Sequence, residues 1–178
     1  MNAAIESGIT GDAIRILGID PGSQVTGFGL VDLQGSVTRA VRWGGIKTSG
    51  DHHARLREIF RAVGELVEEF RPVEIAIERV FVHKNADSAL KLGQARAAAL
   101  CATFGAEIPV FEYGARHIKK AVVGSGSAEK TQVQHMVRLI LGIRDEIQAD
   151  AADALAAAIC HAHERSAREL IERRAGGA

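Results

Sequence analysis

Short apolar runs bounded by turn residues open the chain and predict three strands. Residues 15–20 form an apolar run that ends in Asp20, and Pro21-Gly22 follows, so this run predicts a buried strand that ends in a turn. Residues 25–33 and 36–47 are rich in β-branched and aromatic side chains, which favours two further strands. The Gln34-Gly35 pair between them indicates a tight hairpin.

The middle of the chain alternates between helical and strand patterns. Apolar residues between 56 and 70 keep the three-and-four spacing of one helical face, and the next proline ends this pattern. Small and apolar residues between 86 and 104 share a second helical face, which Gly105 ends. Residues 73–78 and 108–113 are typical of a fourth and a fifth strand.

Three more helices are expected at about 115–122, 128–141 and 149–166. Strands separated by helices favour parallel pairing, whereas the opening hairpins are antiparallel. We therefore expect an α/β fold, with a mixed five-stranded sheet flanked by helices on both faces. The expected organisation is a single domain over residues 14–166, a flexible leader (1–13) and a flexible, charged tail (167–178).

Composition narrows the class of protein. The chain has 178 residues, of which 47% are hydrophobic, so it can bury the core of one domain. No apolar run approaches the ~20 residues that a membrane helix needs. The N-terminus lacks the basic start and apolar stretch of a signal peptide, so we expect a cytoplasmic protein with no membrane partner. Cys101 and Cys160 lie among apolar helical residues, so we expect buried, reduced thiols.

The charges balance, with 22 basic and 22 acidic residues. Domains that bind nucleic acids are often basic, so this balance argues against that class. A protein that gathers acids at one site can nevertheless present a basic surface elsewhere. The positions of the charges, not their sum, must decide.

Four acids stand where the predicted elements would bring them together. Asp20 and Glu78 end the first and fourth strands, and parallel strands place such ends at one edge of a sheet, where sites form in α/β proteins. Asp150 and Asp153 are three residues apart at the start of the last helix, so they share one face. Carboxylates suit hard cations such as Mg²⁺, and two such ions can stabilise both the attacking and the leaving oxygen of a phosphodiester.

Each acid also has a structural explanation. Asp20 before Pro-Gly can cap a turn, and Glu78 can pair with Arg79. Asp150 and Asp153 are favoured at a helix N-terminus by the helix dipole, by roughly 0.3–1 kcal/mol each. The functional interpretation therefore depends on the set and not on any single member.

Two groups of basic residues accompany the acids. The first comprises Arg116, Lys119, Lys120 and Lys130, and the second comprises Arg79, Lys84, Lys91 and Arg96. Solvated helix faces explain many such groups, and we adopt that explanation for Lys91 and Arg96.

Lys130 is harder to explain structurally. If Ser127 caps the helix, Lys130 falls in its first turn, where a cation is disfavoured. A bound anion would be favourable for both the lysine and the free backbone amides, and Gly124-Ser125-Gly126 would let a phosphate backbone approach closely. The stretch GSGSAEKT is one residue short of a P-loop and carries Glu129 at the second glycine position, which excludes that motif.

Two other residue types near the acids have open interpretations. Phe81 follows Glu78 by three residues, and it either stacks on an unpaired base or covers the core beneath its loop. His161 and His163 lie on opposite sides of their helix without a partner at metal-ligand spacing. For both histidines we expect a surface position.

Four segments of the chain carry a resemblance to a known family: ILGIDPGSQVTGFG, AIERVFVHKNADSALKLGQARAAAL, PVFEYGARHIKKAVVGSGSAEKTQVQHMV and QADAADALAAAICHAH. In this order, over about residues 15–165, they closely resemble the RuvC family of bacterial Holliday junction resolvases. That family is part of the RNase H and retroviral integrase superfamily. The resemblance implies an RNase H-like fold.

The resemblance also implies roles for individual residues. The catalytic acids and metal ligands would be Asp20, Glu78, Asp150 and Asp153. They would serve two Mg²⁺ ions per site, for which Mn²⁺ can substitute. Lys119 and Lys130 would contact DNA or stabilise charge at the cut phosphate, and Phe81 would stack at the junction centre. Further candidate DNA contacts are Arg79, Lys84, Arg116 and Lys120.

Family members act as homodimers on four-way junction DNA, cut opposing strands symmetrically and work with the RuvA–RuvB branch-migration complex. Arg79 departs from the glutamine expected at its position, and His83-Lys84 is a basic pair beside it. Both departures concern contacts at the junction centre and the preference for a cut-site sequence.

The resulting hypothesis is a junction-specific endonuclease that leaves 5′-phosphate and 3′-hydroxyl ends. One rival is a sugar-kinase-like or actin-like ATPase, because GIDPGSQVTGFGLV resembles their phosphate-binding hairpin. Those proteins need two such domains and a longer chain. The other rival is a non-catalytic junction-binding module, which should lack four acids facing a polyanion.

Overall fold

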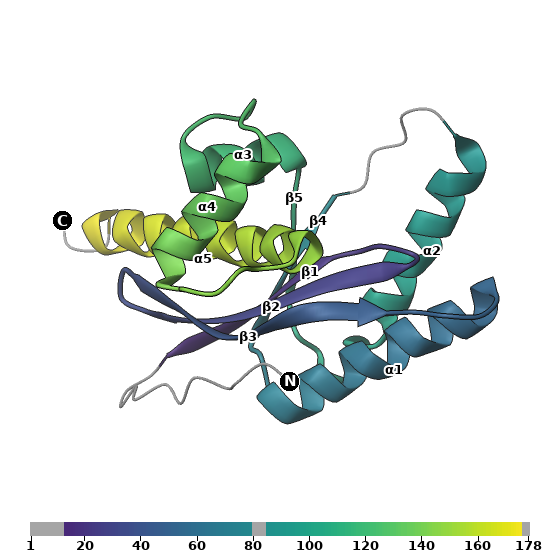
Figure 1. Ribbon diagram of the computed structural model, residues 1–178. Coiled ribbons are helices and arrows are strands. Elements are labelled where there is room, and N and C mark those ends of the chain that lie inside the picture. The colour runs from purple at the N-terminus through teal and green to yellow at the C-terminus, as the bar shows by residue number, and fades with distance from the viewer. Residues whose placement is uncertain (1–12, 80–84, 176–178) are drawn as a thin grey trace.

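A five-stranded mixed sheet forms the centre of the protein, as the computed structural model of residues 13–79 and 85–175 describes it (Figure 1). The strands are β1 (Ile14–Asp20), β2 (Val25–Gln34), β3 (Val37–Lys47), β4 (Glu74–Glu78) and β5 (Val110–Tyr113). Their order across the sheet is β3-β2-β1-β4-β5. β1–β2 and β2–β3 pair antiparallel, whereas β1–β4 and β4–β5 pair parallel, so the predicted mixture is confirmed.

Helices cover both faces of this sheet, as the sequence predicts. One face carries α1 (His52–Phe70) and α2 (Ala86–Cys101). The other carries α3 (Ala115–Val123), α4 (Lys130–Leu141) and α5 (Ala149–Ala175) (Figure 1). α2 ends at Cys101, and a short 3₁₀ turn at Phe104–Ala106 follows it, so the second helix is shorter than its apolar pattern indicates.

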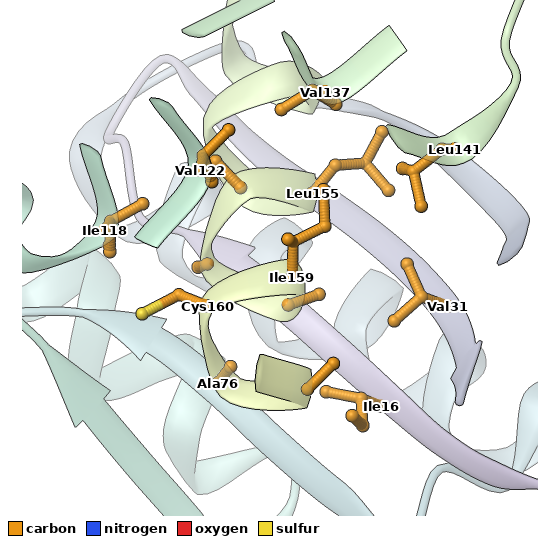
Figure 2. Close-up of a cluster of buried hydrophobic side chains, with 14 of the residues drawn as sticks. Ile16, Val31, Ala76, Ile118, Val122, Val137, Leu141, Leu155, Ile159 and Cys160 are labelled. Carbon is orange, nitrogen blue, oxygen red and sulfur yellow. The ribbon is translucent and has the colours of Figure 1, made fainter. Parts of the chain in front are cut away.

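Side chains that alternate along the central strands contribute to two hydrophobic cores, one on each face of the sheet. In β1, Leu17 and Ile19 pack toward α1 and α2, whereas Ile16 packs toward α5. Val31 of β2 joins the core beneath α5, together with Leu155 and Ile159 (Figure 2). β1 is therefore buried on both faces, which accounts for its continuous apolar sequence.

Helix α5 lies unusually close to the sheet. A Cβ atom added at Gly18 would overlap the backbone carbonyl of Ala154, and one added at Gly27 would overlap that of Asp150. α5 meets this glycine surface with alanines, including Ala151 and Ala158, that are at most 1% exposed. Small residues on both sides let the helix backbone rest on the strands, and this contact places the first turn of α5 above β1 and β2.

The end of the last helix and the exposure of one cysteine differ from the predictions. The last helix does not end near residue 166 but continues to Ala175, because ion pairs of Arg165 and Arg173 with Glu169 at four-residue spacing support the segment predicted as a tail. Cys160 is buried as predicted, but Cys101 is exposed, since it lies on the outer side of the last turn of α2.

His161 is completely buried, not at the surface, whereas His163 is exposed as predicted. Nε2 of His161 lies 2.8 Å from a carboxylate oxygen of Glu74, and its Nδ1 lies 2.7 Å from the hydroxyl oxygen of Tyr113. Burial lowers the pKa of His161. The neutral ring satisfies both partners when Nε2–H donates to Glu74 and Nδ1 accepts from Tyr113. The helical periodicity of α5 could not reveal the burial of His161, because both of its partners come from strands, Glu74 from β4 and Tyr113 from β5.

Candidate active site

Asp20 and Glu78 occupy the positions predicted for them. β1 and β4 are parallel neighbours with Ile19 opposite Ile77, so the residue after each ends its strand at the same edge of the sheet. Both acids are half-buried. The turn after Asp20 is closed by Thr26, whose hydroxyl donates to the carbonyl of Gly22 at 2.8 Å.

The first turn of α5 brings the other two acids to the same place. Asp150 lies over Gly27, the residue that pairs with Asp20 across β1 and β2. Asp153 follows one turn later, and both side chains are half-buried. The close contact between α5 and the glycine-bearing strands therefore joins the two acids at the ends of β1 and β4 to the two at the start of α5.

The charges of these acids act on one another. Burial raises the pKa of Asp20 to about 7, and the carboxylates of Asp153, Glu78 and Asp150 add to this rise, while Lys130 opposes it. Burial, followed by the charge of Asp153, also raises the pKa of Glu78. The site therefore holds more negative charge than its surroundings neutralise, which is a signature of functional sites.

Lys130 forms an ion pair with one of these acids. Its Nζ lies 3.1 Å from Oδ2 of Asp153, and that ion pair raises the pKa of the lysine. The lysine side chain is 73% exposed. The predicted cap is wrong in detail, because Glu129 and not Ser127 caps α4, through a capping box with Gln132. Lys130 is thus the first helical residue, a position where the dipole disfavours a cation and a nearby anion offsets that cost.

Lys119 joins Lys130 beside the acids. Its Nζ donates to the carbonyl of Ala128 at 2.8 Å, which holds it near the start of α4. Both lysines line a hollow of about 200 Å³ together with Glu78 and Asp153. Two cations and two anions thus face one concave space between α3, α4 and α5.

The four carboxylates converge without forming a ready-made metal shell. Within residues 13–79 and 85–175, no group of three or more histidine, cysteine, aspartate or glutamate side chains is arranged to hold a metal ion. The donor set nevertheless fits a hard divalent cation, because it consists of carboxylate oxygens, and burial together with the neighbouring carboxylates raises the pKa of Asp20 to about 7. The ligand set stays a prediction.

The other predicted DNA contacts are dispersed. Arg116 and Lys120 are exposed on α3. Arg79 lies 3.7 Å from Glu112, so the alternative pairing with Glu78 is not observed. Lys91 and Arg96 pair with Asp87 and Glu112. Phe81 and Lys84, which were also predicted to contact DNA, lie outside the described residues.

No helix in the described ranges is long and apolar enough to cross a membrane.

Gly18 and Gly27 help to position the acids of α5, and the hydrophobic pattern of the sequence did not identify them. They lie inside predicted strands, where a glycine weakens the element and often marks the close approach of another backbone. That signal was available in the sequence, but only the tertiary structure identifies α5 as the approaching element.

Comparison with known proteins bears on this arrangement. The family model described as "Crossover junction endodeoxyribonuclease RuvC" matches residues 16–161. The chain belongs to the RuvC family. The RuvC of Methylococcus capsulatus is 54% identical over 160 residues, covering 89% of this chain and 96% of that protein. The RuvC of Pseudoalteromonas translucida is 58% identical over 150 residues, covering 83% and 86%.

Solved structures agree with the family assignment. Thermus thermophilus RuvC in complex with Holliday junction substrate is 36% identical, with a TM-score of 0.81 over 86% of this chain and 95% of that one. The yeast mitochondrial Holliday junction resolvase Ydc2 shares the fold, with a TM-score of 0.66 over 92% of this chain and 84% of that one, at 15% identity. The RNase H-like α/β fold expected from the sequence is thereby confirmed.

Proposed function

We propose that this protein is a divalent-metal-dependent endodeoxyribonuclease that resolves Holliday junctions by paired, symmetric nicks in opposing strands. The observation that carries the proposal is the convergence of Asp20, Glu78, Asp150 and Asp153. Burial and then the charges of the other three carboxylates raise the pKa of Asp20 to about 7. Membership of the RuvC family supports the reaction and the substrate, since its relatives are named crossover junction endodeoxyribonucleases.

Asp20, Glu78, Asp150 and Asp153 would hold two Mg²⁺ ions, and Mn²⁺ would substitute. When bound, the ions would supply charge neutralisation at the phosphodiester and activation of the attacking water. The carboxylates themselves would have to be ionised to serve as ligands. The raised pKa of Asp20 therefore predicts that metal binding weakens as the pH falls below about 7.

Lys119 and Lys130 would act on the DNA itself. Lys130 pairs with Asp153 and is largely exposed, so its ammonium group can exchange that partner for a phosphate oxygen. Lys119 is held by the carbonyl of Ala128 in the same hollow. Both cations would neutralise charge that develops on the phosphate during cleavage, which leaves a 5′-phosphate and a 3′-hydroxyl.

The wider assembly belongs to the same proposal. A homodimer would present two such sites, and its two-fold symmetry would match that of a four-way junction. The RuvA–RuvB complex would be its partner in the cell. Arg79, Arg116 and Lys120 would contribute contacts to the DNA arms, as would Phe81 and Lys84.

Cleavage of a synthetic four-way junction tests the proposal. The wild-type protein should produce paired nicks that require Mg²⁺ or Mn²⁺, and a linear duplex of matched sequence should stay intact. Asp20→Asn should retain junction binding but lose roughly 100-fold or more in cleavage rate, the scale of losing one preorganised electrostatic contact. Asp145→Asn, at an exposed loop acid, serves as the control and should cleave normally.

The binding-module alternative makes the opposite prediction. A pure binder would hold junctions equally well with and without metal and would never nick them. Binding without cleavage by the wild type, across several junction sequences and with Mn²⁺ as well as Mg²⁺, would disprove the enzyme proposal.

A further inference from the structure

A second hollow lies at β2 and β3, whereas the hollow at Lys119 and Lys130 includes Glu78 of β4, and β1 with Asp20 runs between β2 and β4. It has a volume of about 420 Å³, which is within the range of ligand-binding clefts. Its walls come from β2, from β3, from the loop before α5 and from the start of α5. The lining residues are Phe28, Arg42, Trp43, Gly44, Gly45, Lys47, Glu146, Gln148 and Ala151.

The register of the sheet sets how far this groove is from the acids. Asp20 pairs with Gly27, and Gly27 pairs with Gly45, so the three residues form one row across β1, β2 and β3. Adjacent strands are about 4.8 Å apart, which places Gly45 roughly 10 Å from Asp20. Ala151, which lines the groove, directly follows Asp150. The groove is thus a lateral extension of the candidate active site.

One face of β3 forms the floor of the groove. Trp43, Gly45 and Lys47 alternate along the strand, so they point to the same side of the sheet. A Cβ atom added at Gly45 would lie 2.9 Å from Cγ1 of Val25 and 3.6 Å from Oε1 of Gln148. Gly45 therefore contributes no side chain of its own to the floor between the ring of Trp43 and the ammonium group of Lys47.

The chemistry of the lining suits a nucleotide. Trp43 is half-buried and packs against the core beneath α5, which restrains its ring while leaving part of it accessible. Lys47 is exposed and lies on the same side of β3 as Trp43, so its ammonium group is available to an anion at one end of the floor. An aromatic face binds any base by stacking, and a nearby cation binds its phosphate.

We infer that this groove binds an unpaired nucleotide of the DNA strand being cut, with its base against Trp43 and its phosphate at Lys47. A span of about 10 Å corresponds to about three nucleotides at the 3.4 Å repeat of a stacked strand. The strand would thus run from Lys119 and Lys130, across the acids, to this groove. The inference rests on the proposed function, because it assumes that DNA crosses the acids.

Trp43 is the sole tryptophan among the 178 residues, so its fluorescence reports on the groove directly. The experiment titrates a four-way junction, and separately a short oligothymidine, into the Asp20→Asn protein, which should not cut. Stacking of a base on Trp43 should quench the emission in step with binding measured by a labelled junction. Trp43→Leu should weaken junction binding about fivefold or more, as expected for one lost base–aromatic stack, and Trp43→Phe should restore most of it.

A charge-matched pair of variants separates the groove from general electrostatics. Lys47→Gln should weaken binding and reduce the quenching by oligothymidine. Arg61→Gln removes the same charge from the exposed face of α1, where Arg61 pairs with Glu65, and should change neither. The Lys47 variant and the wild-type fluorescence remain informative even if a Trp43 variant folds poorly.

The outcomes also separate this inference from the proposed function. If the wild type cuts junctions but DNA binding leaves Trp43 emission unchanged, or if Lys47→Gln behaves like Arg61→Gln, the groove assignment is overturned and the nuclease proposal stands. If the wild type neither cuts nor binds junctions, the proposed function is refuted and the groove inference, which depends on it, is refuted as well. Binding with quenching but without cleavage would support the groove and refute the nuclease.

Discussion

At the scale of single residues, the ionised carboxylate of Asp20 destabilises the fold that carries it, because it is buried beside three other acids. Burial and three neighbouring carboxylates raise its pKa from 3.8 to about 7. The folded protein therefore binds a proton at Asp20 more tightly than the unfolded chain does. This stabilising contribution is complete below about pH 4 and is lost as the pH rises through 7.

Asp20→Asn should accordingly stabilise the metal-free protein at high pH. One pKa unit corresponds to about 1.4 kcal/mol, so the gain should reach about 2–4 kcal/mol at pH 8 and vanish near pH 4. Thermal unfolding at both pH values, without metal, measures it as a difference of several degrees in Tm. Asp145→Asn provides the baseline for an exposed acid. An equal Tm for wild type and Asp20→Asn at pH 8 would refute the destabilised carboxylate.

Among the elements, the contact between α5 and the sheet has the largest effect on the site. Gly18 and Gly27 leave room for the backbone of α5, and this contact places Asp150 and Asp153 near Asp20. Chain separation makes the contact non-local, because more than a hundred residues lie between β2 and α5. Any side chain at these glycines must push the helix and its two acids away from β1.

Gly18→Ala should therefore both destabilise the protein and impair cleavage. Overpacking of a core by one methyl group costs about 1–3 kcal/mol, and the displaced acids should lower the cleavage rate. Gly64→Ala is the matched control, because a Cβ there meets no atom within 4 Å and lies inside α1. That control should gain about 0.5–1 kcal/mol. Urea unfolding compares the two, and equal stability of both variants would contradict the close contact.

For the molecule as a whole, a buried polar chain joins the middle of the sequence to its last helix. Glu74 of β4 bonds to His161 and to Arg165, both of α5, and His161 bonds to Tyr113 of β5. Phe111 stacks on the His161 ring with centroids 4.2 Å apart. These contacts anchor the later turns of α5, while the glycines seat its first turn. The helix is thus held along its length above the strands that carry Asp20 and Glu78.

Glu74→Ala should cost about 3–5 kcal/mol, since it leaves a buried histidine and a partly buried arginine without their partner. The control is Glu65→Ala, which removes an exposed carboxylate paired with Arg61 at 2.9 Å and should cost less than about 1 kcal/mol. Chemical denaturation of both variants measures the difference. A loss for Glu74→Ala no larger than that for Glu65→Ala would show that the buried chain contributes little.

By itself, the sequence determined the local features of this protein. Apolar runs and helical periodicity are local consequences of side-chain alternation, so the five strands, the first helices and the strand-end positions of Asp20 and Glu78 were all predictable. The order of strands and helices also implied the parallel pairing that brings those two acids to one edge. The positions of the four acids suggested that they could gather, and the resemblance to the RuvC family implied their catalytic role and the reaction.

Only the tertiary structure decided how distant residues meet. The contact of α5 with Gly27, the burial of His161 between Glu74 and Tyr113, and the pairing of Lys130 with Asp153 all join residues that are far apart in the chain. The groove at Trp43 likewise forms only where the edge strand meets the loop before α5. Periodicity reports which side of its own element a residue occupies. The element that covers that side is set by packing across the whole domain.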